Sequence, residues 1–113
     1  MSKIIKAATG HFTERMSKIN SMVIPEWGGV EIFYRPSMNF KNQGIILKLH
    51  GDGLPAEAIV MTLILKAMNK DESNMFTKAD RFDLLRHVDP EVVSRIVSEM
   101  SDDDLTVEDA TKN

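Results

Sequence analysis

Few side chains in this sequence are of the types that carry out chemistry, and their spacing favours no reactive site. His50 precedes Asp52 by two residues, as in many acid–base and metal sites, but no further ligand follows at a metal-binding spacing. The polar run that begins at Asp71 resembles the start of a calcium loop. Its sixth and twelfth positions are Phe76 and Phe82, where such a loop needs glycine and glutamate. We therefore predict no metal site.

Covalent catalysis is not indicated either. The chain has no cysteine, no GxSxG or HExxH motif and no phosphate-binding glycine loop, and none of its three histidines stands beside a plausible nucleophile. We predict that the protein is not an enzyme and uses no cofactor. The lack of cysteine fits a reducing compartment, and residues 1–10 lack the apolar run of a signal peptide, so we expect a cytoplasmic protein.

Charge is unevenly distributed along the 113 residues, a length typical of one domain. Residues 101–113 hold five acidic residues against one lysine, a net charge of −4, and they are predicted to form a disordered acidic tail. The other hundred residues hold 13 basic and 12 acidic side chains, a net charge of +1. A nearly neutral folded part gives no electrostatic case for nucleic acid as a partner.

Residues 54–68 are strongly apolar and predict the central helix of the domain. After Pro55 only Glu57, Thr62 and Lys66 are polar, and at about 100° per residue they do not gather on one face. Pro55 suits the first position of a helix. The helix would be about 20 Å long, too short to span a bilayer. Either the domain covers it on all sides, or one side packs on another protein or a second copy.

Residues 22–36 are predicted to form a β-hairpin. Two β-rich runs flank residues 25–29, PEWGG, whose glycines can adopt the positive φ of a tight reversal. Every second residue from Val30 to Tyr34 is apolar, which is typical of a strand with one buried face. Trp27 at the tip is interpreted either as a lid on the core or as an exposed contact for a partner.

Three further helices are predicted at residues 38–50, 78–88 and 90–100. Ser37 can cap the first of them, and residues 77–80 resemble a capping box with aspartate in place of glutamate. Asp89 and Pro90 combine an N-cap with the fixed φ of a first helical position. The last helix then carries a regular apolar stripe of Val92, Val93, Ile96, Val97 and Met100.

The N-terminal residues 1–21 form a mildly basic arm. Phe12, Met16 and Ile19 have helical spacing, but the stripe is short and Gly10 weakens a continuous helix. Two interpretations stay open: a flexible arm with solvated charges, or an arm that is partly ordered or orders only on a partner. The sequence thus predicts a mainly helical α+β fold, in which a small β-hairpin packs on about four helices within a globular domain at residues 22–100.

The order of these features is similar to that of a known family. A strand pair around PEWGG leads into Tyr34-Arg35-Pro36, and the apolar helix is followed by an acidic loop and then by residues 75–80, MFTKAD, and Leu84. With the terminal helix, this pattern resembles the tail assembly chaperones of long, flexible-tailed bacteriophages and prophages. The most specific part is the acidic loop that leads into residues 76–80, and the resemblance covers residues 22–100.

The resemblance implies a non-enzymatic helper that binds the tape measure protein, keeps it soluble and recruits tail tube subunits. It implies action in the bacterial host cytoplasm, absence from the mature virion, and no membrane or nucleic acid as a partner. Many such proteins are made in two forms, the longer one by a ribosomal frameshift. The codons of Thr111-Lys112-Asn113 can spell a run of adenines ending in AAC, a slippery sequence, and residues 101–113 would then be a linker. Self-association and pairing with the longer form are left open.

The alternative is a small DNA-binding regulatory protein whose C-terminal half is similar to a helix-turn-helix. A recognition helix needs basic and amide side chains, whereas residues 89–100 offer Arg95 alone against three acidic residues. For contact with a protein partner we predict Trp27, Tyr34 and Arg35 on the hairpin. Arg35 is alternatively a structural ion-pair partner.

Overall fold

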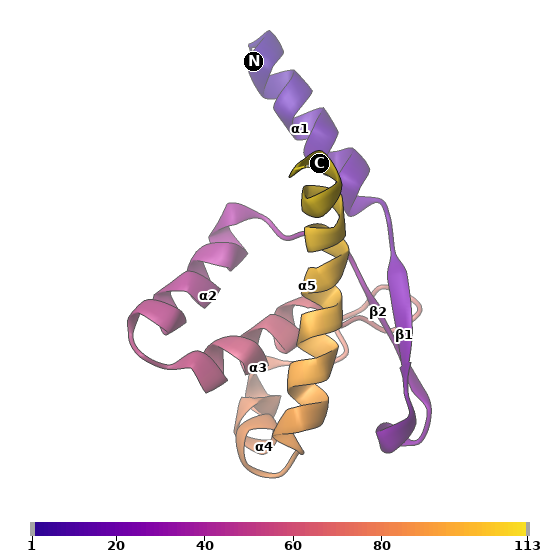
Figure 1. The fold of residues 1–113 in the computed structure, drawn as a ribbon, viewed down its shortest axis with the longest axis vertical. Helices are drawn as coiled ribbons and strands as arrows, with labels where there is room; N and C mark the ends of the chain where they lie inside the picture. The colour runs from indigo at the N-terminus through magenta and orange to yellow at the C-terminus, as the bar shows by residue number, and fades with distance from the viewer. Residues whose placement is uncertain (1, 113) are drawn as a thin grey trace.

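The computed structural model describes residues 2–112, with the side chains of residues 102–112 left undescribed. It is a mainly helical α+β fold, as predicted, and Figure 1 shows the hairpin on one side of the long C-terminal helix and the shorter helices of residues 40–86 mostly on the other. The helices and strands are α1 (Lys3–Met16), β1 (Asn20–Ile24), β2 (Val30–Tyr34), α2 (Phe40–Gly51), α3 (Pro55–Lys66), α4 (Arg81–Arg86) and α5 (Pro90–Lys112).

Helix α3 is the centre of the fold, as its apolar sequence predicts. Pro55 occupies its first turn, and six of its twelve residues are buried, among them Leu63 at 0% exposure. The helix ends at Lys66, two residues before the predicted end, because Ala67 turns to an extended backbone with ψ of 130°. Met68 then pairs with Phe33 of β2 through hydrogen bonds of 2.7 and 3.0 Å. The end of the helix is thereby joined to the hairpin.

The predicted hairpin is confirmed. Strands β1 and β2 are antiparallel with Met22 opposite Ile32, and the loop between them reverses through Gly28 and Gly29, which have φ of 73° and 77°. Ile32 and Tyr34 are buried as the alternation predicted, but Val30, which directly follows the hairpin loop, is exposed. The pairing begins at residue 20, two residues before the predicted start, because Asn20 lies opposite Tyr34.

The remaining predicted helices are present with shifted ends. Asn39 caps α2 in place of Ser37, since its side chain accepts the backbone N–H of Asn42 at 2.9 Å. The helix predicted at residues 78–88 is a 3₁₀ turn, Lys78–Asp80, followed by α4. The capping box is formed as predicted, because the Asp80 carboxylate accepts the Thr77 backbone N–H at 2.8 Å.

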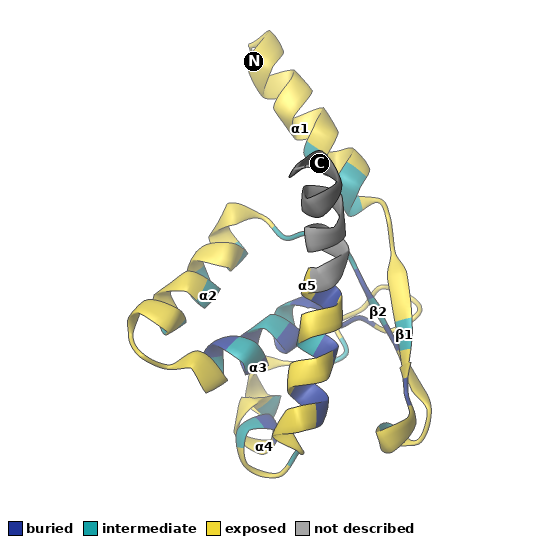
Figure 2. Cartoon of the chain, viewed as in Figure 1, coloured by how far each residue is buried: buried dark blue, intermediate teal, exposed yellow. Residues whose placement is uncertain are grey.

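Helix α5 supplies the other half of the core. Its predicted stripe turns inward, and Ile96 and Met100 are completely buried against the residues of α3 and the hairpin. Figure 2 shows this burial concentrated on α3, on β2 and on one side of α5. The helical backbone continues from Pro90 to Lys112. The helix predicted at residues 90–100 therefore continues into the segment 101–113 that was predicted as a disordered acidic tail, and the side chains of residues 102–112 lie outside the described residues.

The N-terminal arm contains a helix that the sequence did not clearly predict. Helix α1 runs through Gly10, with Ser2 as its cap, and none of its residues is buried. Figure 1 shows it projecting from the end of the body where β1 begins. Isolated helices shorter than about 12–15 residues are marginal in water, so a 14-residue helix without burial gains little stability from this chain alone.

Replacing Gly10 with alanine is expected to stabilise α1 by about 1 kcal/mol, because alanine is the better helix former and a Cβ at Gly10 meets no atom within 4 Å. The helical signal in far-UV circular dichroism should increase. Gly53→Ala is the matched control, since φ of 77° at Gly53 strains any side chain there. An equal gain from both substitutions would contradict the prediction.

Candidate partner-binding surface

Arg35 lies at the junction of three segments. Its Nε donates to the carbonyl of Met16 at the end of α1 at 2.6 Å, its Nη1 lies 2.9 Å from the sulfur of Met68, and its Nη2 donates to Glu72 at 2.5 Å. The side chain is 28% exposed. Arg35 therefore has the structural ion-pair role that the sequence left as an alternative. A contact with a partner stays a prediction for this residue.

The two aromatic residues predicted as partner contacts are placed differently. Tyr34 is 4% exposed and belongs to the core, so it offers a partner almost no surface in the free protein. Trp27 is half-buried at the hairpin tip, packs against the core and meets Phe76 edge to face, with ring centroids 6.4 Å apart. The structure does not gather the three predicted residues into one patch: Trp27 lies at the hairpin tip, and Arg35 follows the other end of β2.

The hairpin tip is tied to α5 by an ion pair that sequence reasoning missed. Both oxygens of the Glu26 carboxylate accept from the Arg95 guanidinium, at 2.6 and 2.7 Å. These hydrogen bonds lower the pKa of Glu26 from its ordinary value of 4.5 to about 2. The partners are 69 residues apart in sequence, and no local pattern predicts such a pair.

This pair predicts a defined pH dependence. Because the pKa of Glu26 is depressed on folding, its contribution to stability is complete above about pH 4.5 and is lost as the pH falls toward 2. Glu26→Gln should therefore lower the urea midpoint at pH 6, and the difference from wild type should shrink steadily down to pH 3. Arg95→Gln should reproduce this profile. A difference that stays constant with pH would contradict the assignment.

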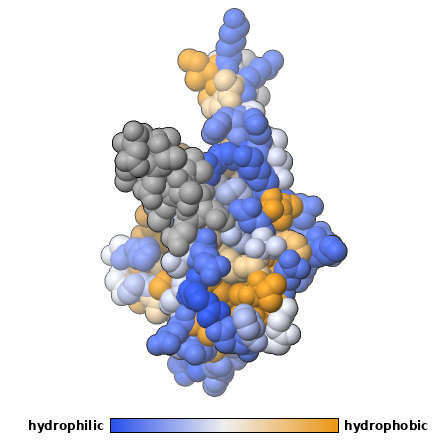
Figure 3. Space-filling model, turned by 45° about the vertical axis from the view of Figure 1, so that its right-hand side comes forward, coloured by the Kyte–Doolittle hydropathy of each residue, from blue (hydrophilic) through white to orange (hydrophobic). Residues whose placement is uncertain are grey.

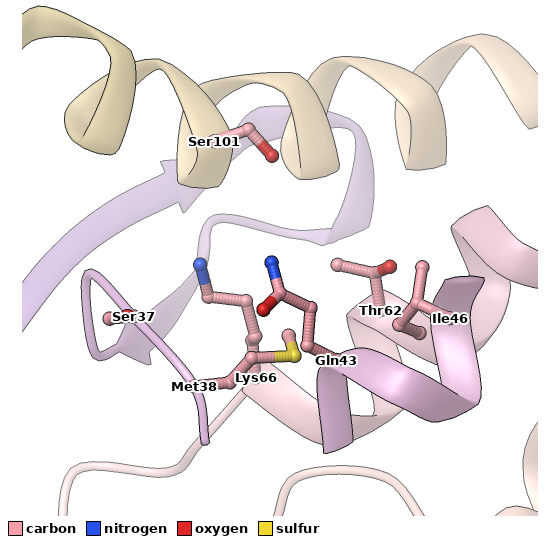
Figure 4. Close-up of a pocket in the computed structure, with 7 residues that line it drawn as sticks. All are labelled: Ser37, Met38, Gln43, Ile46, Thr62, Lys66 and Ser101. Atoms are coloured by element: carbon pink, nitrogen blue, oxygen red, sulfur yellow. The ribbon is translucent and has the colours of Figure 1, made fainter. Parts of the chain in front are cut away.

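A small polar pocket lies between α2, α3 and α5 (Figure 4). It has a volume of about 200 Å³, and its lining residues are Ser37, Met38, Gln43, Ile46, Thr62, Lys66 and Ser101. Lys66 is 8% exposed, and its ammonium lies 3.5 Å from the carbonyl oxygens of Pro36 and Met100. None of the described residues that line the pocket is a histidine or an acidic residue, so these residues provide no acid–base pair.

Of the residues that first suggested chemistry, the two aspartates have structural roles. Asp52 pairs with Lys48 at 2.9 Å, while His50 is exposed. Asp71 accepts hydrogen bonds from Ser73, which lower the pKa of its carboxyl group. Among the residues that the structure describes, no group of three or more histidine or acidic side chains could hold a metal ion. Within the same residues, no helix is both long and apolar enough to cross a membrane.

A wider groove runs between α1 and the start of α2. It has a volume of about 670 Å³, and its lining is mostly apolar. The residues that line it are Ala8, Thr9, Phe12, Thr13, Ser37, Met38, Asn39, Phe40 and Gln43. The side chain of Phe40 is 88% exposed in the free protein. Sequence reasoning missed this surface because α1 was not assigned as a helix.

The structure thus defines a small, mainly helical α+β protein whose described surface offers grooves and exposed apolar side chains. Its fold is similar to the solved structure of the tail assembly chaperone of bacteriophage HK97. The TM-score is 0.63 at 20% sequence identity, over 75% of this chain and 79% of that chain. The fold that the family resemblance implied is therefore confirmed. No protein-family model and no curated protein matches the sequence.

Proposed function

We propose that this protein is a tail assembly chaperone of a long, flexible-tailed bacteriophage or prophage. In this role it binds the tape measure protein, keeps it soluble and recruits tail tube subunits. The observation that carries the proposal is the likeness of fold to the chaperone of phage HK97 over three quarters of the chain. The order of motifs in residues 22–100 supports it from the sequence side.

The surface of the described residues supports a protein-binding role. Several large apolar side chains are exposed instead of buried, among them Ile4, Ile5, Val23, Phe40 and Leu47. Figure 3 shows hydrophobic atoms at the surface both on the N-terminal helix and on the body below it. A chaperone that covers amphipathic helices of a client needs such exposed apolar groups, because burying them is the main source of affinity.

The DNA-binding alternative gains no support from the C-terminal half. Arg95 is the base that a recognition helix at α5 would have used, and its guanidinium is bound by both oxygens of Glu26. Helix α4, which would precede the recognition helix, has only six residues. The proposed site of action is the host cytoplasm, with the protein absent from the virion and a frameshifted longer form as a further product.

Co-expression with the tape measure protein encoded nearby tests the proposal. We expect the tape measure protein to become soluble and to elute with this chain in size-exclusion chromatography. Tail tube subunits added to that complex should bind it and should not bind this chain alone. A tape measure protein that stays insoluble with both this chain and its longer form would refute the proposed function.

Trp27→Ala in the same co-expression tests the hairpin contact. Trp27 is half-buried, so the variant should remain folded while it loses tape measure binding if the tip is a contact. Phe82→Ala is the matched control, since it removes another partly exposed aromatic ring from a different element. An equal yield of complex from both variants would leave Trp27 with only its packing role.

A further inference from the structure

The α1–α2 groove, defined by the lining residues given above, has two helical walls of similar pattern. On α1, Ala8, Thr9, Phe12 and Thr13 share one face, and Ile5 falls within it at about 100° per residue. Ile5 and Phe12 are the large apolar residues of this face; no residue of α1 is fully buried, and Phe12 is partly covered. Helix α1 is therefore a formed helix with an apolar stripe that is largely exposed to solvent.

The second wall repeats this arrangement on α2. Phe40 and Gln43 line the groove, and Leu47 falls between them on the same face, seven residues after Phe40. Leu47 is 62% exposed. Gly44 belongs to this face too, and a Cβ there would meet nothing within 4 Å. This face of α2 is thus apolar and exposed, and the space beside Gly44 can accept a side chain of a partner.

Positive charge flanks both walls. Lys6 and Arg15 fall on the two sides of the α1 face, each about 90° from its centre, whereas Glu14 lies about 170° away, on the opposite face. On α2, Lys41 and Lys48 both lie about 80–100° from Phe40, and α2 contains no acidic residue. Lys48 pairs with Asp52, but no carboxylate among residues 2–101 pairs with Lys6 or Lys41. The groove is therefore apolar along its floor, and basic residues flank it on both sides of the α1 face and on the side of the α2 face opposite Gln43.

We propose that the α1–α2 groove binds an acidic amphipathic α-helix of a partner protein. The apolar side of such a helix would cover Ile5, Phe12, Phe40 and Leu47, and its acidic flanks would face Lys6 and Lys41. This inference rests on the proposed function and names the surface and the chemistry of the client segment. The groove that this helix would enter has a volume of about 670 Å³.

Other occupants fit the groove less well. A symmetric second copy that brought the two grooves together would place basic α1 against basic α1, which is unfavourable for like charges. An anionic membrane needs a convex amphipathic face, whereas this surface is a channel between two helices. A helix of about 10–12 Å diameter is the shape that two helical walls enclose, with anchors at positions i, i+3 or i+4, and i+7.

Two designed peptides of about 20 residues test the charge preference of the groove. Both carry the same leucine stripe, and their polar faces consist of glutamate in one and of lysine in the other. The full chain should bind the glutamate peptide at least about tenfold more tightly in fluorescence anisotropy, and the preference should weaken in high salt. Equal binding of both peptides, no binding of either, or preferred binding of anionic vesicles would overturn the proposal.

Variants of exposed residues then locate the site. The double variant Lys6→Glu and Lys41→Glu should reverse the order of the two peptides, whereas Lys70→Glu with Lys78→Glu changes net charge equally elsewhere and should not. Phe40→Ala should weaken glutamate-peptide binding about tenfold without loss of stability, because its ring is already in water. Unchanged peptide binding by both groove variants would overturn the proposal.

Co-expression with the tape measure protein separates this inference from the proposed function. Wild type should solubilise the client, and the two groove variants should fail. A client that both variants solubilise as well as wild type would overturn the groove and leave the function intact. A client that wild type cannot solubilise, although the glutamate peptide binds, would overturn the function alone. Salt-sensitive self-association without peptide binding would assign the groove to a second copy and overturn the proposal.

Discussion

Replacing Ile96 with alanine should lower the free energy of unfolding by about 2–5 kcal/mol. Ile96 is completely buried on α5, in the same core cluster as Leu63 of α3 and Ile32 of the hairpin. Alanine removes apolar contacts and leaves a cavity where three elements meet, and a site enclosed on all sides relaxes only partly. A domain of this size is stable by about 5–15 kcal/mol, so this single change would remove a large share of its stability.

Urea titration followed by circular dichroism measures this effect. Ile96→Val is the graded variant and should cost about 0.5–1.5 kcal/mol, because it removes one methylene. Leu47→Ala is the exposed control, with the Leu47 side chain 62% in solvent, and should change stability by less than about 0.5 kcal/mol. A loss below 1 kcal/mol for Ile96→Ala would mean that α5 does not pack against α3 and the hairpin as described.

The helices of this core could be predicted because their signals are local. In α3 a proline at the first turn is followed by a run of apolar residues, and in α5 the apolar spacing alone marks the inward face. The capping box at Thr77 and Asp80 is likewise contained in four residues. Such patterns act within one or two turns of backbone, so the sequence predicts them without knowledge of the tertiary structure.

The ends of elements and the long-range pairs could not be predicted in this way. Helix α3 ends at Lys66 because Met68 pairs with Phe33, a residue 35 positions earlier. The Glu26–Arg95 pair likewise depends on where the hairpin tip meets α5. Each of these contacts is made only after the chain has folded, and nothing in the neighbouring residues specifies the partner.

Helix α1 was not predicted for a different reason, because its local sequence argues against a helix. Its sequence contains Gly10 and a short apolar stripe, which weigh against a helix, and it has no buried residue to offset them. The groove that we assign to a partner depends on this helix, so the candidate surface was missed together with it. Of the hairpin residues predicted as contacts, Trp27 is half-buried and Tyr34 is buried. The alternation that identifies Tyr34 as a strand residue also places its side chain in the core.

Replacing Arg35 with alanine should lower the free energy of unfolding by about 1–3 kcal/mol. The guanidinium donates to a backbone carbonyl of Met16 and to the carboxylate of Glu72, and charge-assisted hydrogen bonds contribute about 1.5–3 kcal/mol when buried. Partial exposure of 28% reduces that value. Arg35→Lys should recover only part of the loss, because one ammonium cannot reach three acceptors with the geometry of the planar fork.

The same substitution should loosen two distant segments. Glu72 has φ of 70°, a left-handed conformation that costs a non-glycine residue about 1–2 kcal/mol, and its bond to Arg35 helps to hold it there. Without the guanidinium, amide hydrogen exchange should accelerate in residues 69–75 and at the end of α1, while the centre of α3 should stay protected. Acceleration confined to residues near 35 would show that Arg35 does not join these segments.

Glu72→Gly separates the ion pair from the backbone strain. Glycine loses the carboxylate but adopts positive φ without a steric cost, so the net change should stay within about 1 kcal/mol of zero. In a double-mutant cycle, Arg35→Ala should then cost less in the Glu72→Gly background than in wild type by the energy of the pair. Equal costs in both backgrounds would assign the role of Arg35 to its contacts with Met16 and Met68 and not to the ion pair with Glu72.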